Sequence, residues 1–540
     1  MMRTALIYLI SILVMILCVP MCISLLYAMI DQGGWSSSSD QIAFLGTIFF
    51  GLSLAYPNYR RSKLAGVQTD IKPTDAFLIV SLTWFISAAF GALPYYLYGW
   101  CEYFGLDGGH LTHSDTLGQE FTSFSNAFFE SMSGFTTTGA TIIEKGLWAS
   151  YSNGLGYLAD GTLALPRSLM LWRCVTHLLG GMGIVVLGVA ILPILGVGGM
   201  QLYHAEVPGP MNERFTPRIG EGAKLLWKIY GWMILCLAGL YWLLGMDHFE
   251  AICHSMSTMA TGGFSTRASS IAAFESPSIE WVTILFMFLA GVNFTLYSLM
   301  RSTWASPRVL LNKLKENSEF VVYLGITLIS SILIAWSLYS HQGLPGHEAP
   351  LRTASFQVLS ILTTTGYASA DFELWVTAPM AIGTLIILMF IGGCAGSTGG
   401  GIKVIRHILV FRLCFREFFF LLHPTGKKSV RSGGQVVSPS TLRAIIGFVG
   451  LYTFLVLVGT FYFIFEGQDV VTAFTATAAS LGNIGPGLAE VGPSDDFSCM
   501  SSFGKWVSAS LMLMGRLEIL TVMILFTPGY WKHWRLTQNT

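Results

Sequence analysis

The sequence predicts an all-α integral membrane protein, in which two N-terminal transmembrane helices precede four pseudo-symmetric repeats of helix, re-entrant half-helix and helix. Three observations support this prediction. Charged residues are scarce, apolar runs of membrane-spanning length recur, and a half-helix ending in glycine occurs four times. Only 11% of the 540 residues are charged and 53% are hydrophobic, whereas a soluble domain carries about 25% charged residues. This composition points to the lipid bilayer.

Apolar runs of about 20 residues, the length needed to cross a hydrocarbon core, recur along the whole chain. The predicted spans are residues 5–28, 41–56, 75–98, 168–195, 223–244, 280–300, 320–339, 379–420 (interrupted), 443–465 and 505–526. The first run exceeds the roughly 7–15 apolar residues of a secretion signal, so we predict a membrane helix there.

The distribution of basic residues predicts the topology. With a cytoplasmic N-terminus, 23 of the 30 Lys and Arg residues fall on the cytoplasmic side. Arg173 and Arg516 lie within spans, and the five remaining residues face outward: Lys145, Arg167, Arg267, Arg352 and Lys505. Such a bias is typical of positive-inside sorting, and it predicts a multi-pass protein with both termini in the cytoplasm.

Four segments on the predicted outer side are too short to span and end in small-residue turns. They are residues 124–139, 249–262, 354–366 and 473–485, and two of them end in Thr-Thr-Thr-Gly. We therefore predict two N-terminal helices in residues 1–72, followed by repeats in residues 73–200, 201–316, 317–440 and 441–540.

Turns of this kind indicate a cation pathway. Non-helical backbone at membrane depth must be buried in protein or face water. Glycine allows dihedral angles that align successive carbonyl oxygens, and such oxygens can replace the hydration shell of a cation. Each half-helix also points the negative end of its dipole inward. Four such turns around one axis therefore predict an ion pore.

Several longer motifs resemble the bacterial Trk potassium-uptake proteins of the TrkH/TrkG type. They are Ser131-Met-Ser-Gly-Phe-Thr-Thr-Thr-Gly-Ala140, Gly515-Arg-Leu-Glu518 and residues 165–193, 198–210 and 392–403. The resemblance runs over almost the whole chain and implies a potassium filter. Its glycines map onto Gly139, Gly262, Gly366 and Gly485, and the residues before them map onto Thr137, Thr138, Ala260, Thr261, Thr364, Thr365, Asn483 and Ile484.

Two of the turns depart from the family pattern. The fourth lacks the threonine of Thr-x-Gly, and the second has Ala260 where the others have polar residues. All four glycines are present, which in this superfamily goes with a preference for potassium over sodium.

A glycine-rich segment interrupts the eighth span. It lacks the order of a phosphate-binding G-x-x-x-x-G-K-[ST] loop, which leaves a structural kink or a flexible gate beneath the filter. The resemblance implies the gate, formed by Gly392, Gly393, Gly396, Ser397, Thr398, Gly399, Gly400, Gly401 and Lys403.

Charged and titratable residues within spans need a partner or water. For Arg516 two interpretations stay open, namely a positive barrier on the ion path, as the family implies, and an ion pair with Glu518. We expect structural roles for Arg173 and Glu130. We expect a hydrogen-bonded packing role for His254, with a proton relay as the alternative.

The resemblance also implies a homodimer in the bacterial inner membrane, surrounded by lipid and gated by a cytosolic nucleotide-binding ring protein of the TrkA type. Potassium would be the transported ion, nucleotide would act only through the partner, and no covalent cofactor or nucleic acid is expected. The sequence shows no Ser/His/Asp set, H-E-x-x-H motif, paired carboxylates or C-x-x-C spacing among its nine cysteines, so no enzyme is predicted. Proton- or sodium-coupled symport stays open, and a secondary transporter of an organic solute is the alternative from another class.

Overall fold

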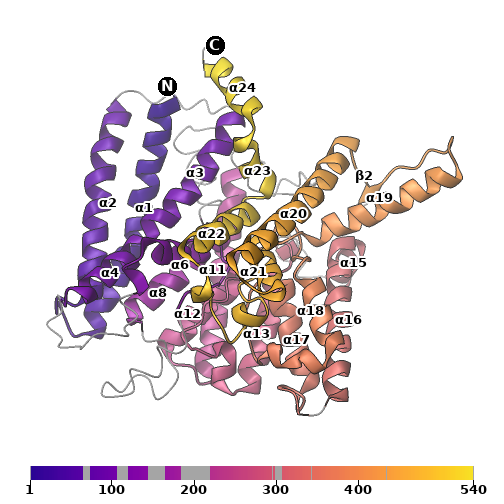
Figure 1. Ribbon diagram of the computed structural model, residues 1–540, viewed down its shortest axis with the longest axis horizontal. Helices are drawn as coiled ribbons and strands as arrows, with labels where there is room; N and C mark the ends of the chain where they lie inside the picture. The colour runs from indigo at the N-terminus through magenta and orange to yellow at the C-terminus, as the bar shows by residue number, and fades with distance from the viewer. Residues whose placement is uncertain are drawn as a thin grey trace.

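The computed structural model describes residues 2–64, 73–105, 120–143, 165–183, 219–294, 296–297, 307–341, 343–432 and 435–538. Helices dominate these residues (Figure 1). A short antiparallel pair, β1 (Arg431–Ser432) and β2 (Gln435–Val436), is the extended structure among them. The second half of the predicted span 168–195, the segment 198–210, and Lys72, Lys145, Arg214, Arg218 and Arg301 lie outside the described residues.

Among the described residues, six helices are long and apolar enough to cross a membrane. These spans are Thr4–Asp31, Ser39–Leu64, Phe77–Tyr103, Lys224–Leu243, Ser318–Ser340 and Pro439–Glu466. They belong to α1 (Met2–Asp31), α2 (Ser39–Leu64), α3 (Pro73–Gly91) with α4 (Leu93–Tyr103), α11 (Ile219–Leu243), α16 (Ser318–Ser340) and α20 (Pro439–Glu466). The chain is therefore a multi-pass, all-α membrane protein, as predicted. Both termini lie at the same end of the molecule (Figure 1).

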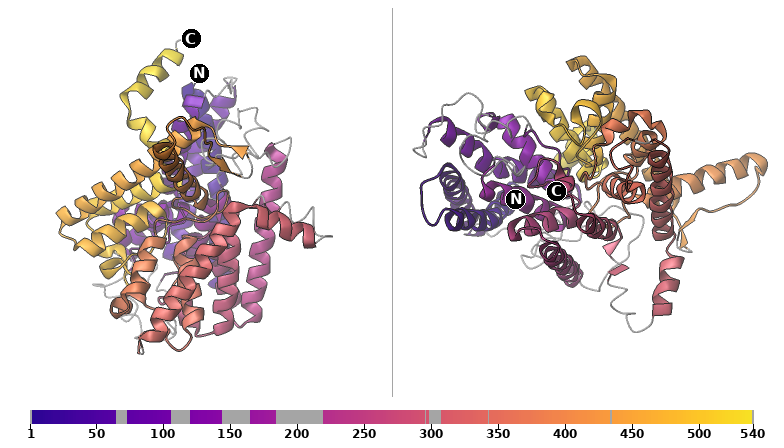
Figure 2. Two further views of the ribbon diagram at one scale, coloured as in Figure 1. Left: turned by 90° about the vertical axis from the view of Figure 1, so that its right-hand side faces the viewer. Right: turned by 90° about the horizontal axis from the view of Figure 1, so that it is seen from below.

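Four short helices correspond to the predicted half-helices, and each packs against one of the long helices. They are α6 (Phe124–Phe135), α12 (His248–Met259), α17 (Pro350–Leu362) and α21 (Val470–Gly482). Their long partners are α3, α11, α16 and α20 respectively. The turns that end the short helices lie close to one another. The first two helices, α1 and α2, pack together at one side of the molecule (Figure 2).

Within the described residues, the helix that follows each half-helix departs from a continuous α-helix, which corrects the prediction of continuous spans at residues 280–300 and 505–526. The interrupted helices are α8 (Arg167–Leu178) with the π-turn η1 (Leu179–Gly183), α13 (Pro277–Ala290), α18 (Pro379–Leu388), and α22 (Ser502–Arg516) with α23 (Ile519–Met523). α22 and the helical segment Ile519–Phe526 meet at 115°. Glu518, at this bend, has a left-handed φ of 59°, which no α-helix accommodates. α13 ends at Gly291, where a Cβ would collide with the Tyr323 hydroxyl.

The remaining helices and 3₁₀ turns connect or follow these elements. They are α15 (Pro307–Glu316), α19 (Val404–Leu422), α24 (Pro528–Gln538) and the 3₁₀ turns η2 (Ser270–Phe274), η3 (Phe372–Thr377), η4 (Ala489–Val491), η5 (Phe497–Cys499) and η6 (Ile524–Phe526). α19 projects away from the helical body (Figure 1).

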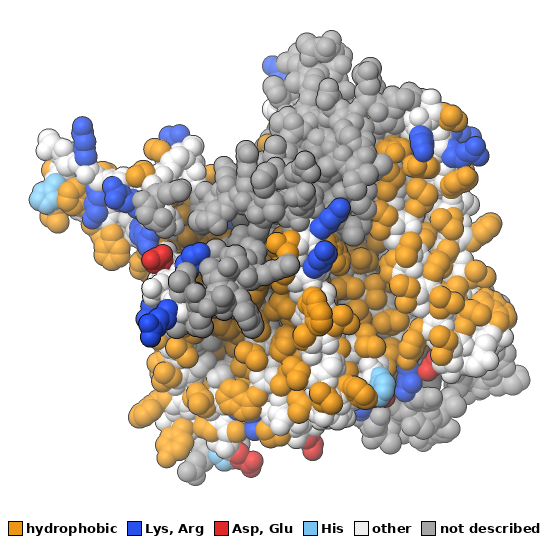
Figure 3. All heavy atoms as spheres, turned by 180° about the vertical axis from the view of Figure 1, so that it is seen from behind, with side chains coloured by type: hydrophobic (Ala, Val, Ile, Leu, Met, Phe, Trp, Pro, Cys, Tyr) orange, Lys and Arg blue, Asp and Glu red, His pale blue; other side chains and the backbone are white. Residues whose placement is uncertain are grey.

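Apolar and polar side chains are distributed in the reverse of the pattern usual in soluble proteins. Large apolar side chains such as Trp232, Leu235 and Trp336 are exposed, and hydrophobic residues cover most of the described surface in Figure 3. Small polar side chains such as Ser257 and Thr258 are fully buried on the central half-helices. An apolar exterior suits lipid, and a polar centre suits a pathway for a hydrophilic solute.

Candidate ion-conducting site

The four half-helices end in the same backbone turn. In each turn a backbone N–H donates to the carbonyl five residues earlier: Thr138 to Ser133 (2.9 Å), Gly262 to Ser257 (2.9 Å), Thr365 to Ser360 (2.8 Å) and Ile484 to Ala479 (2.9 Å). Such a bond, spanning a left-handed residue, is the Schellman ending of a helix. The backbone is therefore equivalent in all four turns although the side chains differ.

The left-handed position of each turn is occupied by a residue other than glycine. These residues are Thr137, Thr261, Thr364 and Asn483, with φ of 53°, 54°, 58° and 53°. Asparagine tolerates this conformation, but a β-branched threonine is an outlier that costs roughly 1–3 kcal/mol. Such strain persists only where the surroundings enforce it, and it clusters at functional sites.

Glycines close the four turns into a ring. Gly139, Gly263, Gly366 and Gly485 have φ of 80°, 83°, 80° and 101°. A Cβ on each would collide with a carbonyl oxygen of the next turn: Gly262 for Gly139, Thr365 for Gly263, Ile484 for Gly366 and Thr138 for Gly485. The contacts run from the first turn to the second, third and fourth and back to the first. We call residues 137–139, 261–263, 364–366 and 483–485 the turn ring.

The second turn corrects the alignment predicted from sequence by one residue. Gly263, not Gly262, has the positive φ and the close carbonyl contact. Gly262 occupies the position of Thr138, and it is small because a Cβ would collide with the buried imidazole of His177. Ala260 consequently belongs to the helix end, where it caps α12. The spacing Thr-x-Gly, satisfied by Thr261 and Gly263, is the sequence signal that would have found this register.

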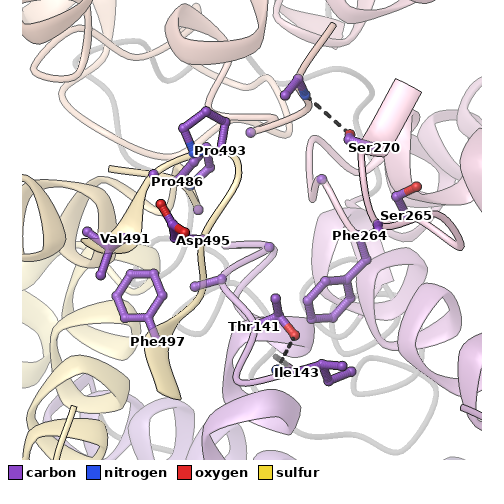
Figure 4. A pocket seen from close by; sticks show the side chains of 18 of the residues that line it. Thr141, Ile143, Phe264, Ser265, Ser270, Pro486, Val491, Pro493, Asp495 and Phe497 are labelled. Atoms are coloured by element: carbon purple, nitrogen blue, oxygen red, sulfur yellow. Dashed lines mark hydrogen bonds between the residues drawn. The ribbon is translucent and has the colours of Figure 1, made fainter. Parts of the chain in front are cut away.

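A cavity opens on the glycine side of the ring (Figure 4). Its lining includes the four ring glycines, Phe264, Pro486 and Asp495. Two arginines also line it, and each is paired with a carboxylate: Arg173 with Glu130 at 2.7 Å and Arg267 with Glu250 at 2.6 Å. Their positive charges are therefore largely compensated at this mouth.

The remaining intramembrane residues singled out by sequence hold the outer segments together. Glu130 also accepts the Ile142 N–H at 3.2 Å, and the Arg173 guanidinium lies 4.0 Å from the centre of the Phe264 ring. His254 contacts the Glu250 carbonyl through Nδ1 (2.8 Å) and the Ser265 hydroxyl through Nε2 (2.9 Å). These contacts are those of structural ion pairing and of a hydrogen-bonded packing histidine.

The glycine-rich loop, residues 392–403, contacts the opposite side of the turn ring. The Gly400 N–H donates to the Thr364 hydroxyl at 2.6 Å, and a Cβ on Gly399 would lie 2.9 Å from the Thr363 carbonyl oxygen. Two bonds join the loop to the end of α13, from the Cys394 N–H to the Gly291 carbonyl (2.9 Å) and from the Phe294 N–H to the Gly396 carbonyl (3.1 Å). The loop therefore lies directly beneath the ring.

Arg516 connects this loop to η1, the π-turn that follows α8. It donates to the Thr398 carbonyl at 2.8 Å and to the Gly180 and Gly181 carbonyls at 2.6 and 3.1 Å. The glycines of η1 were not predicted as site residues. The position of Gly180 nevertheless requires glycine, because a Cβ there would collide with the Phe135 carbonyl oxygen.

The Arg516–Glu518 ion pair, one of the two interpretations from sequence, is wrong, because Glu518 pairs with Arg406. The helix breaks between these two residues, and Arg516 bonds instead to the Thr398 carbonyl. Lys403 is buried and donates to the Gly399 carbonyl within the loop.

Comparison with known proteins identifies the family of this chain. The family model described as TrkH, cation transport protein, matches residues 102–532. The Trk system potassium uptake protein TrkH of Escherichia coli K12 is 36% identical over 94% of this chain and 95% of its own length. The TrkG protein of the same organism is 32% identical over 87% of this chain and 88% of its own length.

Among solved structures, the crystal structure of the potassium transporter TrkH from Vibrio parahaemolyticus superposes with a TM-score of 0.78 at 33% identity. The match covers 98% of this chain and 100% of the transporter. This chain therefore belongs to the TrkH family of cation transport proteins, a family of transporters.

Proposed function

We propose that the protein takes up potassium across the inner membrane of a bacterium, through the turn ring as a selectivity filter. The observation that carries this proposal is the closed ring of four equivalent turns, each completed by a glycine against a carbonyl oxygen of the next. The identity of the transported ion is inferred from its relatives, which are named as potassium uptake proteins.

Selectivity would come from backbone oxygens. The carbonyls of Thr138, Gly262, Thr365 and Ile484 belong to one layer of the ring, because each contacts the glycine of the turn before it. Such oxygens can replace the water around a potassium ion. The four helix C-termini add about half a negative charge each, which favours a cation at the inner side of the ring.

The glycine-rich loop and Arg516 would form the gate. The loop lies against the ring through Thr364, and Arg516 fastens Thr398 of the loop to the backbone of η1. A guanidinium on the path repels a cation electrostatically, while the loop obstructs it sterically. Opening would then require both to move.

Further proposals concern topology and assembly. We place both termini in the cytoplasm, where most basic residues lie. α19 projects from the body with Phe411, Phe415 and Phe418 exposed by 68%, 61% and 60%. We propose a homodimer in which a second copy covers this face. A cytosolic nucleotide-binding ring of the TrkA type would regulate the gate.

The test is potassium flux into liposomes containing the purified protein, with and without proton and sodium gradients. Potassium uptake that follows the membrane potential alone is expected. Uptake that requires a proton or sodium gradient would favour coupled symport, and no potassium uptake by folded protein would contradict the proposal.

Deleting three residues of the loop, Gly396 to Thr398, should raise basal flux without altering selectivity. Unaltered or lower flux from the folded deletion would make the loop a structural kink.

A further inference from the structure

We infer that Glu319 is a positioning residue for the gating loop, and that its carboxylate holds the loop in the closed arrangement. This inference rests on the proposed gating role of the loop. Glu319 lies in the first turn of α16, an outer helix that contributes no residue to the turn ring. Its side chain is nevertheless buried, with only 6% of the residue exposed.

The carboxylate joins the two ends of the loop segment. Its Oε1 accepts the Ala395 N–H at 2.7 Å and the Ile405 N–H at 3.2 Å. Ala395 lies near the start of the loop, and Ile405 lies in the first turn of α19 directly after it. The base of the loop is closed independently by two backbone bonds, from Gly392 N–H to Ile402 (2.8 Å) and from Val404 N–H to Gly393 (3.2 Å). A single oxygen thus links a loop residue to the helix that follows.

α19 lacks a cap of its own at this end. A helix N-terminus leaves backbone N–H groups without intrahelical partners, and these are usually satisfied by an oxygen of the N-cap side chain. The N-cap of α19 is Lys403, which makes no side-chain cap bond. Glu319 supplies the missing acceptor from another helix. Its negative charge also lies at the positive dipole ends of both α16 and α19.

The arrangement stabilises the closed loop specifically. Hydrogen bonds to an ionised acceptor are shorter and roughly twice as strong as neutral ones. If the loop left the ring, the hydrogen bond between the Ala395 N–H and the buried carboxylate would break, and each group would need water as a new partner. Glu319 therefore favours the closed state without touching the ion path.

The thiol of Cys394, next to Ala395, reports the position of the loop. Cys394 is buried, with 1% exposed. The exposed cysteines Cys22, Cys236, Cys414 and Cys499 are first replaced by serine. Labelling of Cys394 by a membrane-impermeant thiol reagent is then measured on the full-length protein in liposomes, alongside basal potassium flux. For Glu319→Gln we expect both the labelling rate and the flux to rise roughly tenfold, the effect of losing one charge-assisted hydrogen bond.

A second variant removes the donor instead of the acceptor. Ala395 is the second residue of the turn closed by the bond from Ser397 N–H to the Cys394 carbonyl, and Gly396, the third residue, has a φ of 70°. Proline suits this position, so Ala395→Pro keeps the turn and loses the N–H that Glu319 accepts. It should reproduce the effect of Glu319→Gln, and it gives an independent result if that variant fails to fold.

Glu280→Gln is the matched control. Glu280 is another buried carboxylate, but it pairs with Arg352 at 2.9 Å at the end of α13 opposite Gly291. Its loss should lower thermal stability without exposing Cys394. Unchanged Cys394 labelling in folded Glu319→Gln and Ala395→Pro would overturn the inference, whatever the flux. Faster labelling without higher flux would uphold the positioning role and contradict the gating role of the loop.

Discussion

The turn ring has a regular backbone, whereas the layer directly beneath it is irregular. In the ring, four different residues, Thr138, Gly262, Thr365 and Ile484, make the same backbone bond and present equivalent carbonyl oxygens. Beneath it, the helices that follow the four half-helices depart from a regular α-helix within the described residues, each in its own way. The interruptions are the π-turn η1, the end of α13 at Gly291, the glycine-rich loop after α18, and the bend at Glu518.

If the protein functions as proposed, this difference lets one chain combine regular coordination of the ion with a single gate. Backbone oxygens need only equivalent dihedral angles, so the side chains of the ring are free to vary wherever space allows. A gate needs one obstruction that can move, and four copies would have to move together. Only one of the four interruptions in the described chain carries a long loop, and it faces Arg516 from another.

The largest expected effect follows from breaking the ring at a glycine. Gly139→Ser and Gly366→Ser place a Cβ against the carbonyl oxygens of Gly262 and Ile484. The oxygens must move, so the potassium-to-sodium uptake ratio should fall at least tenfold, a change of about 1.4 kcal/mol. The measurement is competitive uptake into liposomes.

Gly383→Ser on α18 is the control for this prediction, because a Cβ there meets nothing within 4 Å. Its uptake ratio should stay at the wild-type value. An unchanged ratio in folded Gly139→Ser and Gly366→Ser would contradict the filter assignment.

The register of the second turn can be tested by comparing its two glycines. Gly263→Ala should impair selectivity as Gly139→Ser does, because it breaks the contact with Thr365. Gly262→Ala collides instead with the His177 ring, so adding His177→Ser should relieve it. The measurement is the potassium-to-sodium uptake ratio of the single and double variants. Rescue of Gly263→Ala, rather than of Gly262→Ala, by His177→Ser would refute the register.

In the irregular layer the expected effect is on flux rather than on selectivity. Two unit charges about 8 Å apart repel by roughly 2 kcal/mol at an effective dielectric of 20. Arg516→Gln removes this repulsion and weakens the bonds to Thr398 and Gly180. Potassium flux should rise about thirtyfold, while the uptake ratio stays unchanged.

Flux must be expressed per folded molecule, with folding checked by size-exclusion profile and thermal stability in detergent. Arg167→Gln, which removes a half-exposed arginine paired with Asp31, is the control. A folded Arg516→Gln protein with wild-type flux would rule out the barrier.

The smallest effect concerns strain within the ring. Asn483 shows that asparagine is accommodated at the left-handed position, whereas Thr261 holds the same φ with a β-branched side chain. Thr261→Asn should stabilise the protein by at most about 1 kcal/mol, without changing selectivity. Thermal unfolding in detergent measures this change. A clear loss of stability would indicate that the threonine hydroxyl bond to Ala260 outweighs the strain.

Local sequence patterns accounted for the helices and for the existence of the site. The four half-helices, their order and the glycine-rich interruption were all predicted, because apolar runs and glycine turns are properties of neighbouring residues. The repeat boundaries at residues 73, 201, 317 and 441 stay predictions. The breaks at Gly291 and Glu518 were missed, because each lies inside a run that is apolar enough on average to be predicted as one span, even where Arg516 and Glu518 interrupt the second run.

By itself, the sequence determined that the chain is a membrane protein with four glycine-ended half-helices, since hydropathy and small-residue turns act locally. The tertiary structure alone decided which groups meet. It gave Gly263, rather than Gly262, the positive φ and the close contact with the Thr365 carbonyl, whereas His177, far away in sequence, fills the space beside Gly262. It paired Glu518 with Arg406, and it brought Glu319 to the ends of the loop. These contacts depend on packing between distant helices, and no local periodicity encodes that packing.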